Sequence, residues 1–156
     1  MKTRAGLAVV AAAIASVLVA PVNEAHAATY GRTALKHAAA QKGKPYSSRP
    51  NPTRSFDCSA LTQYAFKRAG KSIPRVAQDQ YNRSKKVSPS NRRPGDLIAI
   101  GRSSRGIYHV GIYAGYWSGK GWMWNANSGK YRGRKVVLAP VKEYTTGAPR
   151  AYYGRF

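Results

Sequence analysis

Apolar and polar residues follow a helical spacing before Pro94 and a strand-like spacing after it. Residues 33–42 are rich in alanine, and residues 58–69 repeat apolar side chains four residues apart. A glycine, which commonly ends a helix, directly follows each segment. The pattern predicts a helix over each segment and a short helical turn within residues 73–81.

After Pro94, five short segments rich in β-branched and aromatic residues are separated by glycine, serine and proline. The predicted strands cover residues 96–100, 107–113, 121–126, 135–138 and 151–156. Helices followed by a series of strands indicate an α+β domain, in which the N-terminal helices pack on one face of an antiparallel β-meander.

The first 27 residues have the three parts of a secretory signal. Two basic residues come first, residues 5–20 are apolar and uncharged, and residues 25–27 (AHA) have the small-x-small pattern of a cleavage site. A membrane anchor is the alternative, but the apolar run is shorter than the ~20 residues that a membrane-spanning helix needs. We therefore predict a signal peptide over residues 1–27, no membrane span, and one exported domain over residues 28–156.

The exported domain is strongly basic. The whole chain has 27 basic and 5 acidic residues, and without Lys2, Arg4 and Glu24 these become 25 and 4, a net charge of +21. Such a chain associates with polyanions, and export favours anionic cell-wall polymers or anionic lipid over nucleic acid. The sequence has no cluster of metal-ligating residues and no glycine-rich phosphate loop. We therefore expect no metal and no cofactor, and we expect a monomer.

Cys58 is the single cysteine of the chain, so an internal disulfide is impossible. It opens the second predicted helix, where Asp57 or Ser55 can cap the first turn. The positive end of the helix and its free N–H groups favour the thiolate, and the same N–H groups can bind an oxyanion. The alternative is a small buried residue against the sheet. Cys58 is a candidate nucleophile if a base lies nearby.

Two histidines of the domain are candidates for that base. His37 lies within the alanine-rich helix, where we interpret it as a spacer. His109 lies in a predicted strand whose alternation places it on one face with Gly111 and Tyr113. The glycine keeps the face beside His109 open, as a site facing a helix end requires. His109 is therefore the candidate base, with a packed or surface histidine as the alternative.

A third candidate follows from the expected pairing of two strands. If Tyr113 and Gly121 close a hairpin, His109 lies opposite Asn125, and cross-strand neighbours on one face are close enough to interact. An amide there can accept the imidazole N–H and direct the other ring nitrogen towards the sulfur, as a Cys-His-Asn arrangement requires. Asn127 lies on the same face and is the alternative.

Three sequence blocks follow one another along the chain: FDCS around Cys58, RPGDL from Arg93 and HVGIYAG from His109, with GKPY from Gly43 before them. In this order they resemble the NlpC/P60 family of cell-wall cysteine peptidases. The resemblance implies a papain-like α+β fold with the nucleophile at a helix start. It also implies hydrolysis of peptide stems in peptidoglycan, commonly at the bond between D-glutamate and the diamino acid.

By matched position, the resemblance implies that Cys58 is the nucleophile, His109 the base and Asn125 the third polar residue. It also implies three residues that line the substrate site: Tyr46, Asp57 and Ser59. The family more often has histidine at the position of Asn125. The segment after Pro45-Tyr46 also differs, because the family usually has two glycines there, and this difference concerns the substrate subsites more than the chemistry.

Three functions fit these observations. The first is a secreted, thiol-dependent peptidoglycan endopeptidase at the cell wall. The second uses the same Cys–His pair to cut the amide between muramic acid and L-alanine. The third is a cationic wall-binding or antimicrobial protein on a degenerate peptidase scaffold, although a purely adhesive protein does not need a single thiol at a helix start.

Overall fold

The computed structural model describes residue 12, residues 22–51 and residues 53–156. Most of the predicted signal peptide lies outside these residues, and its role stays a prediction. In the part of the chain that is described, no helix combines the length and the apolar character that crossing a membrane requires.

Three helices precede the strands of the sheet: α1 (Val22–Ala39), α2 (Cys58–Arg68) and α3 (Ala77–Arg83). Helix α2 begins at Cys58, as predicted. Helix α1 begins eleven residues earlier than the predicted start at residue 33 and continues through Gly31. A β-carbon on Gly31 would lie 2.8 Å from the carbonyl oxygen of Gly95, so the glycine permits a close approach between α1 and the turn at Pro94 and Gly95.

The sheet has six strands in the order β1-β6-β2-β3-β4-β5, and every neighbouring pair is antiparallel. The strands are β1 (Lys85–Val87), β2 (Leu97–Gly101), β3 (Ile107–Trp117), β4 (Lys120–Ser128), β5 (Arg134–Pro140) and β6 (Arg150–Arg155). Strands β2 to β5 form the predicted meander. The α+β prediction is confirmed, although the sequence did not reveal β1 or the return of β6 to pair with β2.

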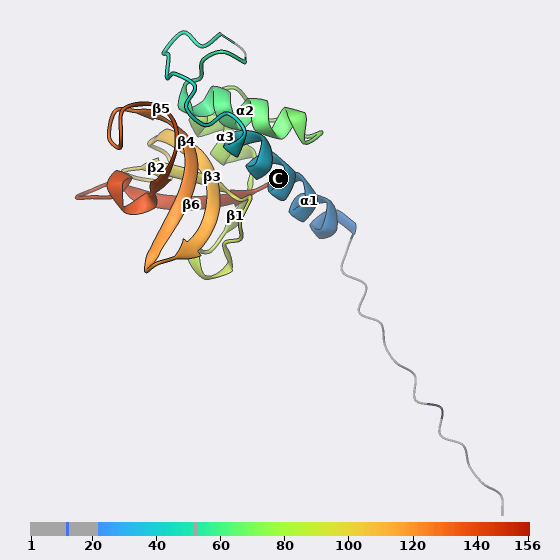
Figure 1. Cartoon of the computed structure of the whole chain (residues 1–156). Helices are drawn as coiled ribbons and strands as arrows, with labels where there is room; N and C mark the ends of the chain where they lie inside the picture. The colour runs from blue at the N-terminus through green and yellow to red at the C-terminus, as the bar shows by residue number, and fades with distance from the viewer. Residues whose placement is uncertain (1–11, 13–21, 52) are drawn as a thin grey trace, which may run out of the picture.

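The two faces of the sheet carry different cores. Figure 1 shows the three helices gathered on one side of the sheet, where Ile112, Ala126 and Val136 pack against Leu61 and Phe66 of α2. The other face carries a second core that is closed by the 3₁₀ helix η2 (Val141–Tyr144). Its strand residues include Ile98, Ile100, Tyr113, Met123 and Val137. By strand alternation, His109 shares this second face with Tyr113.

The predicted register of the β3–β4 hairpin is wrong. The two strands extend past Tyr113 to a pair between Trp117 and Lys120, joined by a two-residue turn at Ser118 and Gly119, whose φ angles are 51° and 70°. An irregularity between Tyr113 and Gly115 then shifts the pairing, so that Tyr113 pairs with Met123. Continued to the start of the strand, this register places Asn125 beside Gly111, two positions from the predicted partner.

A buried ion pair joins the start of the second strand to the last strand. The Asp96 carboxylate accepts hydrogen bonds from Arg155 Nε at 2.7 Å and Nη2 at 2.8 Å, and from the Arg93 backbone N–H at 2.7 Å. Asp96 is only 3% exposed. Because all of these bonds go to a charged group, they are among the stronger hydrogen bonds of the fold.

Replacing Arg155 with Ala should lower the free energy of unfolding by about 3–5 kcal/mol, because it leaves the Asp96 carboxylate buried without its partner. Urea unfolding measures the change. Arg150→Ala is the matched control, since Arg150 lies on the same strand with an exposed side chain, and it should change stability by less than about 0.5 kcal/mol. Equal effects of the two substitutions would show that the ion pair does not stabilise the sheet.

Candidate active site

Cys58 and His109 border one cavity of about 90 Å³. The cavity lies where the beginning of β3 passes the N-terminus of α2. Its remaining lining residues are Tyr46, Tyr108, Ser128, Lys130 and Tyr144. The fold therefore brings together the candidate nucleophile, the candidate base and one of the three predicted substrate-site residues.

Cys58 is the first residue of α2, and Asp57 caps the helix through a 2.7 Å hydrogen bond from the Ala60 N–H. Burial nevertheless raises the pKa of the Cys58 thiol. The backbone N–H groups of Val110 and Ser59 lower this pKa, as does the Arg75 charge, while the Asp57 charge raises it further. The N–H group of Ser59 at the start of α2 thus favours the thiolate, as expected, but loss of solvation on burial outweighs it in the free protein.

Asn125 holds the His109 ring, even though the two residues are not directly opposite. Asn125 Oδ1 lies 3.0 Å from His109 Nε2, and Asn125 Nδ2 donates to the Val137 carbonyl at 3.3 Å. A carbonyl needs a donor, so this second bond sets which end of the amide faces the ring. Nε2 therefore carries the proton, and Nδ1 is the unprotonated nitrogen of the neutral ring.

Burial lowers the pKa of His109 to about 4. The hydrogen bond that the ring donates to Asn125 Oδ1 acts in the opposite direction, and the Lys130 charge lowers this pKa further. With a raised pKa on Cys58 and a lowered pKa on His109, the resting pair is a neutral thiol beside a neutral imidazole.

The predicted substrate-site residues lie on two sides of Cys58. Tyr46 borders the cavity, and the Arg134 guanidinium lies 5.0 Å from the centre of its ring. Asp57 and Ser59 are linked instead to Arg75, which donates to Asp57 Oδ2 at 2.6 Å and to Ser59 Oγ at 2.7 Å. These two residues support the start of α2 and do not line the cavity.

Asn127, the alternative to Asn125, holds the loop between β4 and β5. Its Oδ1 accepts the backbone N–H groups of Gly129 at 3.2 Å and Lys130 at 3.0 Å, and its Nδ2 donates to the carbonyls of Tyr131 and Gly133. This loop supplies Ser128 and Lys130 to the cavity. Asn127 therefore shapes the rim of the site.

Sequence reasoning missed four residues of the cavity: Tyr108, Ser128, Lys130 and Tyr144. No motif marks them. A strand pattern indicates only that Tyr108 and His109 point in opposite directions, and Tyr108 is in fact half-exposed. Lys130 and Tyr144 reach the site through the β4–β5 loop and η2, whose positions depend on long-range pairing.

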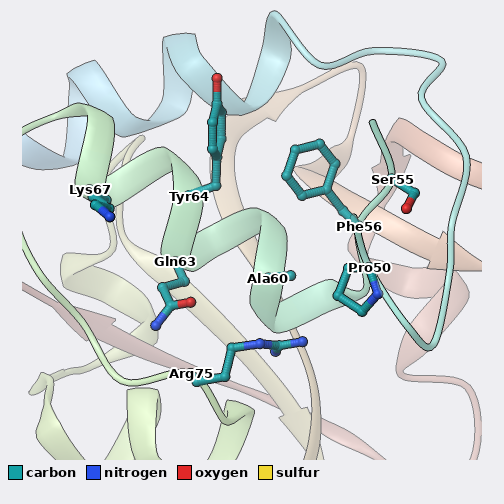
Figure 2. Close-up of a pocket in the computed structure, with 8 residues that line it drawn as sticks. All are labelled: Pro50, Ser55, Phe56, Ala60, Gln63, Tyr64, Lys67 and Arg75. Carbon is teal, nitrogen blue, oxygen red and sulfur yellow. The ribbon is translucent and has the colours of Figure 1, made fainter. Parts of the chain in front are cut away.

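A second cavity of about 270 Å³ lies on the outer side of α2 (Figure 2). Ala60, Gln63, Tyr64 and Lys67 line it from the helix, and their helical spacing places them on the face opposite Cys58. Figure 2 shows Arg75 along the first turn of α2, below Ala60. This cavity is separate from the one that Cys58 and His109 share. Within the described residues, no group of His, Cys, Asp or Glu side chains is arranged to hold a metal ion.

Comparisons with known proteins agree on one family. The NlpC/P60 family model matches residues 43–150. The bifunctional muramidase/DL-endopeptidase CwlT of Bacillus subtilis is 42% identical over 123 residues, which cover 70% of this chain and 36% of CwlT. This chain thus spans little more than a third of that relative's length.

Two solved structures from Mycobacterium tuberculosis share the fold. The peptidoglycan hydrolase RipB is 30% identical with a TM-score of 0.66, and the similarity covers 88% of this chain and 72% of RipB. RipD, described as a non-catalytic NlpC/p60 domain protein adapted to peptidoglycan binding, is 29% identical with a TM-score of 0.62, covering 81% and 96% of the two chains. The fold alone therefore does not decide between hydrolysis and binding.

The lowered pKa of His109 should make the fold sensitive to acid. Between about pH 6.5 and pH 4 the unfolded chain binds a proton at this residue that the folded chain excludes, so the free energy of unfolding falls as the pH falls. Across that window the loss should be roughly 3 kcal/mol. Urea unfolding at several pH values measures it, with His109→Gln as the non-titrating control. If His109→Gln unfolds with the same pH dependence as the wild type, His109 is not the source of the acid sensitivity.

Proposed function

This chain belongs to the NlpC/P60 family, and we propose that it is a secreted, thiol-dependent peptidoglycan endopeptidase that hydrolyses stem-peptide bonds. The observation that carries the proposal is the shared cavity of Cys58 and His109, with Asn125 hydrogen-bonded to the imidazole. Its curated relative CwlT is named as a DL-endopeptidase, and its structural relative RipB is named as a peptidoglycan hydrolase. In this proposal, residues 1–27 are the secretory signal and residues 28–156 are the catalytic domain.

The proposed reaction begins with the neutral pair. His109 Nδ1 accepts the thiol proton as Cys58 Sγ attacks the carbonyl carbon of the scissile amide. The backbone N–H groups of Cys58 and Ser59 are the proposed donors to the oxyanion, because Asp57 already occupies the Ala60 N–H. The imidazolium then gives its proton to the leaving amine, which leaves a thioester on Cys58.

Hydrolysis of the thioester completes the cycle. Water gives a proton to His109 as its oxygen attacks the thioester carbonyl, and the proton returns to the sulfur as the carboxylic acid leaves. Asn125 keeps Nε2 occupied throughout, so the same ring nitrogen accepts and returns each proton. A neutral amide in this place orients the ring without changing its own charge.

The proposed scissile bond joins D-glutamate to the diamino acid, as the family resemblance implies and as the DL-endopeptidase name of CwlT supports. The second reading, cleavage between muramic acid and L-alanine, uses the same pair. Mass spectrometry of digested peptidoglycan separates the two, since the first releases a shortened stem and the second frees the whole stem from the sugar.

A non-catalytic wall-binding function is the other candidate, and the similarity to RipD favours it. A net charge of +22 on the whole chain also supports attraction to anionic wall polymers. The pairing of Cys58 and His109 in one cavity argues for hydrolysis over binding alone. The proposed site of action is the cell wall outside the cell in either case.

Replacing Cys58 with Ala should abolish release of peptides from peptidoglycan while binding to purified walls is retained, because the thiol attacks the amide and the charges lie elsewhere. Iodoacetamide should inactivate the wild type in the same way, whereas a chelator should not. Chromatography of soluble products measures release, and sedimentation with walls measures binding. Peptide release by the Ala variant would remove Cys58 from the role of nucleophile.

Binding to purified walls should weaken steeply as salt rises, because charge attraction is screened beyond a Debye length of about 8 Å at physiological ionic strength. A pull-down across a salt series, carried out with the Cys58→Ala variant, measures binding without hydrolysis. Recognition through uncharged contacts would instead survive molar salt. A flat binding profile would therefore refute attraction by charge.

A further inference from the structure

Tyr144 contacts the candidate base directly, although no sequence pattern marks it. Its ring is stacked on the His109 imidazole, with centroids 4.8 Å apart and an angle of 11° between the planes. Tyr144 is the last residue of η2 and is only 2% exposed. Since η2 is anchored in the second core by Val141, the tyrosine ring forms a fixed wall on one face of the imidazole.

The Tyr144 hydroxyl also reaches the amide that holds the imidazole. It lies 2.9 Å from Asn125 Oδ1 and 2.7 Å from Asn127 Oδ1. Burial raises the pKa of Tyr144, so the hydroxyl keeps its proton at neutral pH. That single proton can serve only one of the two amide oxygens at a time.

The accepting capacity of the two amides decides where the proton goes. Asn127 Oδ1 already accepts two backbone N–H groups from the β4–β5 loop, whereas Asn125 Oδ1 accepts one N–H from His109. An amide oxygen has two lone pairs, so Asn125 Oδ1 still has one lone pair that can accept a hydrogen bond. A hydrogen bond from the Tyr144 hydroxyl to this lone pair completes the bonding of Asn125 Oδ1 and restrains rotation of the amide.

We propose that Tyr144 is a positioning residue for the base: its ring sets the plane of the His109 imidazole, and its hydroxyl orients the Asn125 amide. The assignment rests on the proposed function of Cys58 and His109. The stacked ring has a second effect, because its π face lies against the imidazole when that becomes positively charged during the reaction. Loss of the hydroxyl should therefore loosen the base without removing any contact to the substrate.

The variant Tyr144→Phe tests this, because it keeps the ring and removes only the hydroxyl. With a soluble stem peptide as substrate, kcat should fall on the order of tenfold, since catalysis depends on sub-ångström orientation. KM should stay within about twofold, because ground-state binding is unchanged. Tyr113→Phe is the matched control. Tyr113 is also buried, and its hydroxyl accepts a 3.0 Å hydrogen bond from Arg92 Nε. The kcat of this variant should match that of the wild type.

A spectroscopic measurement tests the proposal without any activity. In a Cys58→Ala background, ¹⁵N NMR of the His109 ring should show one tautomer, with the proton on Nε2. Adding Tyr144→Phe should shift the ring ¹⁵N signals towards a mixture of tautomers, and adding Tyr113→Phe should not. Unchanged ring signals and an unchanged kcat would overturn the role of Tyr144. If the wild type hydrolyses no peptidoglycan, the proposed function fails, while the NMR result still decides whether Tyr144 positions the ring.

Discussion

Burial of the His109 imidazole is the constraint on which the rest of the site depends. A buried polar ring needs hydrogen-bond partners, and Asn125 supplies one only because its own amide is held by the Val137 carbonyl and reached by the Tyr144 hydroxyl. These partners come from β4, β5 and η2. The orientation of one side chain therefore depends on three strands pairing in a single register and on η2 closing the second core.

The same burial sets the protonation state of the pair. Loss of solvation disfavours charge on both groups, so it raises the pKa of Cys58 and lowers the pKa of His109. A helix N-terminus alone would favour the thiolate, but the sulfur is packed beside Val110 and the core around it. In the proposed reaction, charge separation would therefore begin only as Cys58 attacks, when backbone N–H groups can stabilise the developing oxyanion.

Local patterns predicted those parts of the site that depend on neighbouring residues. A cap and an apolar stripe are local, so α2 and the place of Cys58 followed from the sequence, as did the strand alternation that separates His109 from Val110. The register of the β3–β4 hairpin depends on a turn at Ser118 and an irregularity before Gly115, which no alternation indicates. The position of Tyr144 beside His109 depends on long-range strand pairing as well, so no local pattern indicated it.

Two of the few acidic residues have structural roles. Of the five acidic residues, Asp57 caps α2 and binds Arg75, while Asp96 is committed to Arg155. The group that orients His109 is an amide, whereas a carboxylate there would raise the imidazole pKa and favour a charged pair at rest. Asn125 makes the same kind of hydrogen bond without that charge. The Lys130 charge also lowers the imidazole pKa, so the ring stays neutral in the free protein.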